Sequence, residues 1–382
     1  MEKRLVNVAR AILDIDTPQK EFRIEPAKGM LKLDDNTNLS GPSPKVFEAI
    51  NGLMRNWPMN WQSENDENRL LSAISEYVAL PKATIRCFDN VQRTLEYIGR
   101  TYLENGTEVL IDSSSEYPLD RIAAGTGAET SYVSHVNPFE PSIEGLINCI
   151  KPRTRLIYIG NPNGITGGMY SEAELIFLLA YAERAMVVVN EEYFEYSRCS
   201  IADLTMRFPN LMVIRSFSRA FGLGALGLAF LLSDPENLEF IDRLSDGDNL
   251  NRIQISASLA ALDDIAYVKS FVDIVEQSKR VISSNLPEIG YEFFITPANF
   301  FILKVTNSEL LAENLLTDNI KVKDLSDSEM DGYLRITVGT IRQTDQLLVS
   351  LSKLADKAAT GYNRNRFVSI NNRLENRVAV AR

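Results

Sequence analysis

Histidine and cysteine are scarce in this chain. His135 is the single histidine among 382 residues, so a His-based catalytic triad or a His-rich metal site would have to depend on that one side chain. The three cysteines are Cys87, Cys149 and Cys199. They are far apart and match neither a metal-ligand spacing nor a Cys-x-x-Cys pair. We therefore expect no metal site and a reducing compartment, such as the cytoplasm.

Positive charge and long apolar runs are also in short supply. The 40 Lys and Arg residues face 51 Asp and Glu residues, a net charge of −11, which argues against general binding to nucleic acid or to an anionic membrane. The longest apolar stretch, near 175–189, is interrupted by Glu183 and Arg184, so no membrane span is expected. The first ten residues lack the apolar core of a signal peptide.

Short β-rich runs alternate with amphipathic stretches of helical length. One such stretch opens with Ser171 and Glu174 at the spacing of a capping box. The β-rich runs are 108–111, 130–133, 155–159, 186–189, 212–215 and 229–232. Helices are expected at 69–79, 93–104 and 265–286, and strands of a smaller lobe at 291–305, 320–325 and 333–339. This alternation predicts an α/β fold with a mostly parallel sheet covered by helices on both faces.

The length of the chain favours one large and one small domain. We expect an N-terminal arm and part of the small domain in 1–45, a large domain in 46–274, a small C-terminal domain in 275–354 and a tail in 355–382. The tail contains six Lys or Arg residues against two Asp or Glu residues, a balance of +4 on an acidic body. A solvated extension and a segment that docks on a partner protein are both consistent with this composition.

Five segments carry a recognisable pattern in a fixed order along the chain. They are 33–46, which contains Ser-Gly-Pro-Ser-Pro, 161–167 (Asn-Pro-Asn-Gly-Ile-Thr-Gly), 187–193 (Val-Val-Val-Asn-Glu-Glu-Tyr), 214–230, which begins Ile-Arg-Ser-Phe-Ser-Arg, and 335–340 (Arg-Ile-Thr-Val-Gly-Thr). Together they resemble the fold-type-I aminotransferases that use pyridoxal phosphate (PLP), most closely the histidinol-phosphate aminotransferases. The resemblance implies a seven-stranded sheet in the large domain, and a homodimer with the site at the subunit interface.

The resemblance also places several unexpected residues at positions with a chemical task. Arg219 stands where the family has the lysine that forms an imine with PLP, and a guanidinium stays protonated and cannot be that nucleophile. Asn190 stands for the acid that pairs with the pyridine nitrogen. Gly164 replaces an asparagine that bonds the ring hydroxyl, and Gly227 replaces an arginine that binds the phosphate. These separate losses predict a natural departure from imine chemistry, with no covalently held cofactor and PLP or its amine form doubtful.

The resemblance also assigns residues to the contacts with cofactor and substrate. The implied contact residues are, for the cofactor, Asn190, Tyr193, Ser216, Ser218, Tyr117 and Asn163, and, for the substrate, Arg335 and Asn38. The phosphate-binding loop corresponds to 90–93, and Trp57 replaces a tyrosine that the partner subunit supplies. Alternative interpretations stay open: the tyrosines pack in the core, and Ser216 and Ser218 cap the next helix.

Arg219 has two interpretations of its own. It forms an ion pair with Glu191 or Glu192, or it clamps an anionic ligand through the bidentate geometry of its guanidinium.

Three functions are consistent with this sequence. The first is an aminotransferase-like pseudoenzyme that binds a small anionic or amino-acid-like ligand through Arg219 and Arg335. The second is an enzyme that holds PLP or pyridoxamine phosphate without a covalent bond and uses Tyr193 or Glu192 as a general base. The third is a pocket with unrelated chemistry. We favour the first.

Overall fold

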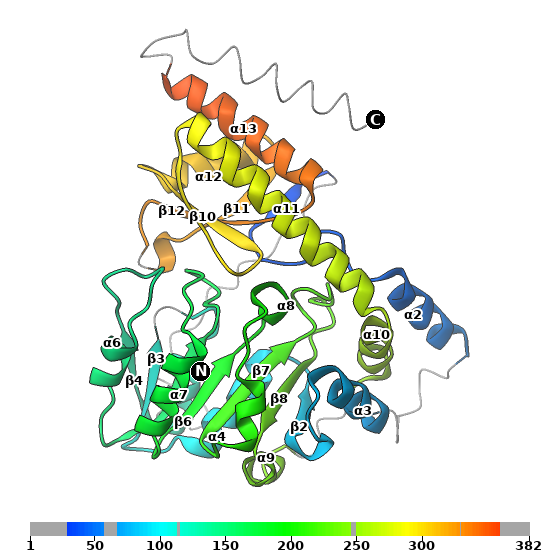
Figure 1. Ribbon diagram of the computed structural model, residues 1–382, viewed down its shortest axis with the longest axis vertical. Coiled ribbons are helices and arrows are strands. Elements are labelled where there is room, and N and C mark those ends of the chain that lie inside the picture. Colours follow the sequence, from blue (N-terminus) through cyan, green and yellow to red (C-terminus); the bar gives the residue numbers. More distant parts are fainter. Residues whose placement is uncertain (1–28, 57–66, 113–114, 246–249, 329, 360–382) are drawn as a thin grey trace, which may run out of the picture. The chain divides into compact units, whose positions relative to one another are not determined.

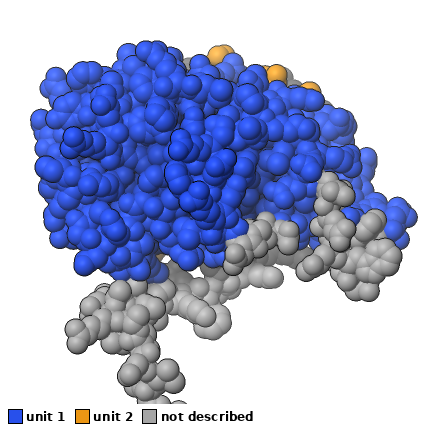
Figure 2. All heavy atoms as spheres, turned by 90° about the horizontal axis from the view of Figure 1, so that it is seen from below, with its two compact units in different colours: residues 1–24, 42–265 blue, residues 25–41, 266–382 orange. Residues whose placement is uncertain are grey.

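The computed structural model describes residues 29–56, 67–112, 115–245, 250–328 and 330–359, with side chains up to residue 355. The chain divides into two compact units (Figures 1 and 2): unit 1 comprises residues 1–24 and 42–265, and unit 2 comprises residues 25–41 and 266–382. Trp57 and the tail from residue 360 onward lie outside the described residues, so the expectations for them stay predictions.

Unit 1 is built on a seven-stranded sheet with the strand order β2-β8-β7-β6-β5-β3-β4. Strands β3 to β7 run parallel to their neighbours, whereas β8 is antiparallel to both β7 and β2. The strands are β2 (Ile85–Phe88), β3 (Glu108–Asp112), β4 (Glu129–Val133), β5 (Thr154–Gly160), β6 (Met186–Asn190), β7 (Leu211–Ser216) and β8 (Ala229–Ser233). The predicted α/β fold with a mostly parallel sheet is confirmed.

The central strands are apolar along their whole length because both faces of the sheet are covered. All five residues of β6 are buried, and Val187, Val188 and Val189 have no exposed surface. A strand buried on both faces needs no alternation of polar and apolar side chains. The six predicted β-rich runs each lie inside an observed strand, whereas the four-residue strand β2, which contains Arg86, was missed.

The helices predicted at 69–79 and 93–104 are found as α3 and α4, each beginning two residues earlier than predicted and ending one or two residues earlier. Ser171 accepts a hydrogen bond from the backbone of Glu174, whose side chain bonds back, so the predicted capping box is confirmed. Helix α10 packs against α2 and α3. The helices are α2 (Pro44–Asn56), α3 (Glu67–Val78), α4 (Val91–Tyr102), α5 (Leu119–Thr126), α6 (Ile143–Asn148), α7 (Glu172–Tyr181), α8 (Phe194–Ser197), α9 (Pro235–Asp242) and α10 (Arg252–Leu262), with 3-10 turns η1 (Lys82–Thr84) and η2 (Ala202–Met206).

Unit 2 contains a mixed five-stranded sheet with the order β1-β11-β12-β10-β9. The predicted strand over 291–305 is two antiparallel strands instead, because residues 296–299 form the turn between them. The elements are β1 (Leu31–Leu33), α11 (Ile265–Ile289), β9 (Glu292–Ile295), β10 (Phe300–Lys304), α12 (Ser308–Thr317), β11 (Ile320–Asp324), η3 (Ser326–Ser328), β12 (Tyr333–Thr337) and α13 (Ile341–Ala359).

Two classes of feature are not found in the described residues. None of their helices combines the length and the apolar character that a membrane crossing requires. Nor does this part of the chain group three or more His, Cys, Asp or Glu side chains in a way that could hold a metal ion.

Candidate functional site

The residues singled out by the motifs of unit 1 meet at the carboxyl edge of its parallel sheet. Asn190 is the last residue of β6 and Ser216 is the last residue of β7. The two strands are paired, with Asn190 opposite Ile214, so the segments that follow them lie together. Ligand sites of open α/β sheets form at this edge.

The carboxylate of Glu192 is the centre of this cluster. Tyr117 donates its hydroxyl proton to Oε2, and the amide Nδ2 of Asn190 donates to the same oxygen over 3.1 Å. The hydroxyl of Ser216 donates to Oε1 over 2.8 Å, and Nε of Arg219 lies 3.7 Å from Oε1. Glu192 is only 2% exposed. Both carboxylate oxygens therefore face donors contributed by the chain itself.

Two of the donors around Glu192, Tyr117 and Asn190, are prepared for this contact by their surroundings. Burial, together with the negative charge of Glu192, raises the pKa of Tyr117 well above its ordinary value, so the phenol keeps its proton and donates it. The amide of Asn190 is oriented twice more, because its Nδ2 also donates to the Tyr158 hydroxyl over 3.0 Å and its Oδ1 accepts from the backbone N–H of Glu192 over 3.1 Å.

Arg219 is bound by a second carboxylate, that of Glu116. Its NH2 group lies 3.0 Å from Oε2 of Glu116, an oxygen that also accepts from the Tyr193 hydroxyl over 3.1 Å. The guanidinium carbon lies 5.2 Å from the centre of the Tyr193 ring. Burial alone would lower the pKa of Arg219, but the neighbouring Tyr193, Glu116 and Glu192 raise it well above its ordinary value. The site therefore contains one cation between two carboxylates.

Only one of the two expected partners of Arg219 faces it. Glu191, the residue before Glu192, points to Arg215, whose Nε and NH2 lie 3.0 and 2.9 Å from Oε2. Glu191 also accepts from the hydroxyl of Ser200 over 2.7 Å and from the backbone of Ile201 over 2.8 Å. The expectation of an Arg219–Glu191 pair is therefore corrected, because Glu191 belongs to a separate buried cluster.

Little free space remains where these side chains meet. The cavity beside Glu116 and Tyr193 measures about 10 Å³, which is about the space of a single water molecule. A Cβ atom on Gly164 would lie 2.0 Å from Oε2 of Glu116. The Glu116 carboxyl group thus occupies the space that a side chain at residue 164 would fill.

The positions expected to bind a phosphate are occupied or closed. Ser216 is bonded to Glu192, and the Ser218 hydroxyl donates to the Gly227 carbonyl over 3.4 Å. Residues 217–228 contain no helix, so the two serines are not helix caps. Gly227 has a φ of +75°, and a Cβ there would lie 2.2 Å from the backbone oxygen of Asp89.

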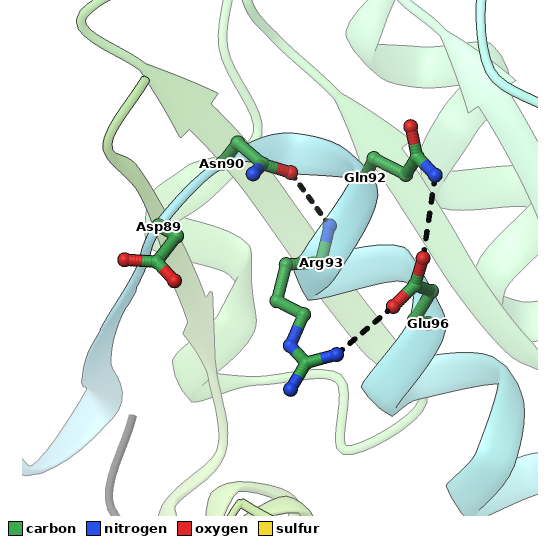
Figure 3. A pocket seen from close by; sticks show the side chains of 5 residues that line it. All are labelled: Asp89, Asn90, Gln92, Arg93 and Glu96. Atoms are coloured by element: carbon green, nitrogen blue, oxygen red, sulfur yellow. Dashed lines mark hydrogen bonds and ion pairs between the residues drawn. The ribbon is translucent and has the colours of Figure 1, made fainter. Parts of the chain in front are cut away.

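A hollow of about 400 Å³ lies at the start of α4 and is lined by Asp89, Asn90, Gln92, Arg93 and Glu96 (Figure 3). Figure 3 shows that Asn90 contacts Arg93, and that Gln92 and Arg93 both contact Glu96. Asn90 accepts from the backbone N–H of Arg93 over 2.8 Å, and the Arg93 guanidinium lies 3.3 Å from Glu96. Two carboxylates and one paired guanidinium do not make a phosphate receptor.

The remaining predicted site residues have local partners. In unit 1, Oδ1 of Asn163 accepts from the backbone of Ile165 over 2.9 Å and shapes the turn that follows. Asn38 and Arg335 belong to unit 2. The side chain of Asn38 accepts from the backbone of Ser40 over 2.9 Å, and Arg335 donates to the backbone oxygen of Asp34 over 3.0 Å.

Sequence reasoning missed Glu116 and a second buried cluster around His135. Nε2 of His135 lies 2.6 Å from Oδ1 of Asp112, and the Tyr170 hydroxyl donates to the same oxygen over 3.0 Å. The backbone N–H of Ser142 donates to Nδ1 over 3.1 Å, which leaves the ring proton on Nε2. This cluster ties the end of β3 to the segment after β4 and to the start of α7.

The only sequence signal for Glu116 was its position next to Tyr117.

The residues of unit 1 do not fit PLP as the resemblance would require. Tyr117 and Asn190, which the resemblance places at its ring, and Ser216, which it places at its phosphate, bind Glu192 instead. The place of the phosphate-binding arginine is a glycine whose Cβ direction is blocked by backbone.

Comparison with known proteins places these observations in a family. The model for aminotransferase class I and II matches residues 28–351. The chain belongs to this family. It is 28% identical over 350 residues to a histidinol-phosphate aminotransferase from Methanococcoides burtonii, covering 90% of this chain and 94% of the relative. It is 28% identical over 334 residues to a dihydroxyacetone phosphate transaminase from Campylobacter jejuni, covering 86% and 91%.

Solved aminotransferases share the fold. Histidinol-phosphate aminotransferase from Sinorhizobium meliloti, in complex with pyridoxal-5'-phosphate, superposes with a TM-score of 0.80 at 20% identity and covers 94% of this chain and 100% of its own. Aspartate aminotransferase from Thermotoga maritima superposes with a TM-score of 0.77 at 19% identity, covering 91% and 100%. At these identities the likeness establishes the fold alone.

The close approach of Glu116 to Gly164 predicts a cost for any added side chain. Gly164→Ala should displace the Glu116 carboxyl group from Arg219 and lower the free energy of unfolding by roughly 1–3 kcal/mol, as overpacking does. Gly125→Ala is the matched control, because a Cβ at residue 125 meets nothing within 4 Å. Urea unfolding of both variants checks this expectation. Because Gly125 lies in α5, and Ala is favoured over Gly in a helix by up to about 1 kcal/mol, the control should equal or exceed the wild type in stability. A Gly164→Ala variant as stable as the wild type would contradict the assigned contact.

Glu195 predicts a dependence of stability on pH. Its Oε1 accepts from the Tyr77 hydroxyl over 2.8 Å, and burial raises its pKa from 4.5 to about 7. The folded state then holds this proton more tightly than the unfolded state, so the stabilisation is complete below pH 4.5 and is lost as pH rises through 7. Between pH 5 and pH 8, the wild type should therefore lose roughly 1–3 kcal/mol of unfolding free energy that Glu195→Gln does not lose.

Urea unfolding at the two pH values measures this gain, with Glu183→Gln, at an exposed position in the turn after α7, as the control. The control should show the same change with pH as the wild type. A Glu195→Gln variant that also follows the wild type would show that the Glu195 carboxyl group titrates normally.

Proposed function

We propose that this chain is a non-catalytic member of the aminotransferase family, unable to form the lysine imine of PLP because its own side chains fill the cofactor pocket. One observation carries the proposal: Tyr117, Asn190, Ser216 and Arg219, the groups that the resemblance assigns to the cofactor, converge on the carboxylate of Glu192. Arg219 stands in this proposal at the position of the lysine.

The reactions named for the relatives show which chemical groups an active member of the family would need. By their names, the Methanococcoides burtonii and Campylobacter jejuni proteins act on histidinol phosphate and dihydroxyacetone phosphate. Such an activity in this chain would need an amine for the imine and an open phosphate receptor. Arg219 supplies no amine, and the two glycines 164 and 227 leave no side chain at two further family positions.

The two alternative functions find less support in the geometry. An enzyme that holds PLP without a covalent bond needs a general base with a lone pair directed at the substrate. The oxygens of Glu192 already face four donors, and Tyr193 donates to Glu116. Unrelated chemistry in the same pocket would need room for a substrate, and the cavity is about 10 Å³.

The proposal also changes the expectation that Arg219 and Arg335 bind an anionic ligand. Arg219 is neutralised by Glu116 and approached by Glu192, so its guanidinium is not an open anion clamp. Arg335 belongs to unit 2 and remains a candidate for a carboxylate contact there. We infer that the chain has a non-catalytic role and forms a homodimer. The exposed apolar side chains of α2 support a second copy: Phe47 is 56% and Met54 is 54% exposed.

Borohydride trapping tests this proposal. Wild type and Arg219→Lys are incubated with PLP and reduced, and the peptide containing residue 219 is measured by mass. The lysine variant should carry no stoichiometric pyridoxyl group and show no transaminase activity, because Glu116 and Glu192 still fill the pocket. The Sinorhizobium meliloti relative is the positive control. Stoichiometric labelling of residue 219, or strong activity from that single change, would refute the proposal.

A further inference from the structure

We propose that unit 1 contains a receptor for a single carboxylate group, closed in the native protein because Glu192 is its occupant, and that removal of this side chain converts it into a binding site for small monocarboxylates such as acetate. The inference rests on the proposed function, because it assumes that the chain's own side chains fill the cofactor pocket. It adds the chemical class of ligand that the pocket is built to hold.

Three of the four donors of this receptor have contacts that do not involve the Glu192 side chain: Asn190, Ser216 and Arg219. The amide of Asn190 is held by the Tyr158 hydroxyl over 3.0 Å. The oxygen of the Ser216 hydroxyl accepts from the backbone N–H of Ser218 over 3.2 Å, which leaves its proton for the carboxylate. Arg219 is fixed by Glu116 over 3.0 Å. Because the donors are pre-organised, an added ligand does not have to order them.

The charges select a monoanion. With Glu192 present, the site contains one guanidinium and two carboxylates, those of Glu116 and Glu192. Without the Glu192 side chain, Arg219 and Glu116 balance each other and the remaining groups facing the gap are donors. A monocarboxylate restores the native charge. Inorganic phosphate brings more charge than was removed, and acetamide has the shape of acetate with no charge.

The size of the gap matches acetate. Glu192→Ala removes a –CH2–COO⁻ fragment, which corresponds to acetate apart from one hydrogen atom. The neighbouring cavity, which Tyr117 and Asn190 also line, measures about 10 Å³, so it adds little room for a larger ligand. Glu192 is 2% exposed, so the bound acetate would be shielded from water, where charge-assisted hydrogen bonds are strong.

The test compares equilibrium unfolding of Glu192→Ala and wild type in acetate, chloride, acetamide and phosphate, at constant ionic strength and pH 7. Ligand binding to the folded state lowers the unfolding constant by the factor 1 + [L]/Kd. We expect about 100 mM acetate to lower the unfolding constant of Glu192→Ala by about tenfold or more, the factor for a Kd near 10 mM. Acetamide and phosphate should change it by less than about twofold.

Three controls separate the receptor from general effects of acetate. Wild type should respond to acetate by less than about twofold, because Glu192 occupies the site. Glu183→Ala, which removes an exposed carboxylate, should behave like wild type. Glu192→Gln, which keeps the shape of the side chain, should also be insensitive to acetate. If acetate stabilises all of these proteins equally, or stabilises Glu192→Ala no more than acetamide does, the receptor is refuted.

If Glu192→Ala folds poorly in chloride, the proposal can still be tested by refolding. In that case the yield of folded protein after dilution from urea is measured in acetate and in acetamide. Recovery in acetate alone supports the receptor, and equal failure in both refutes it. The outcome is independent of the trapping experiment: PLP labelling refutes the proposed function, whereas an absent acetate effect without labelling refutes only the receptor.

Discussion

The carboxylate of Glu192 determines the character of this site because it is buried at 2% exposure and must be fully satisfied. A buried charge is tolerated only when donors or an opposite charge replace its water. Tyr117, Asn190 and Ser216 supply three hydrogen bonds, and Arg219 supplies the charge. Those groups are therefore committed to one another and cannot serve a ligand without leaving Glu192 unpaired.

The family scaffold makes this convergence available. A parallel sheet brings the ends of β5, β6 and β7 to one edge, and the segments after them form a shared site. In this chain, the same edge holds an ion-pair network. Glu116 completes it, and the bare Cα of Gly164 gives Glu116 its room. Residues 116, 164, 192 and 219 are thus physically coupled through shared contacts.

Much of the fold was accessible from the sequence, and the reasons are local. The run Val187–Val189 predicts a strand buried on both faces, and Ser171 with Glu174 predicts a helix start. The turn within 291–305 was missed, although Pro297 lies inside the predicted strand and is a signal against it. The strand β2 was missed because four residues carry too little periodicity.

The site was predictable only in part. The motifs identified Asn190, Tyr193 and Arg219, but not which of two consecutive glutamates faces the guanidinium. That choice depends on the direction of each side chain: Glu192 turns toward Arg219 and Glu191 toward Arg215. Glu116 is about a hundred residues from Arg219 in the chain (|i−j| = 103), so no spacing rule connects them.

A crystal structure of the native protein grown with excess PLP tests the central claim most directly. The account predicts that the Glu192 carboxylate remains bonded to Tyr117, Asn190 and Ser216, with the Arg219 guanidinium between Glu192 and Glu116 and no density for a pyridine ring at this edge of the sheet. Density for the cofactor there, with the Glu192 side chain displaced, would contradict it.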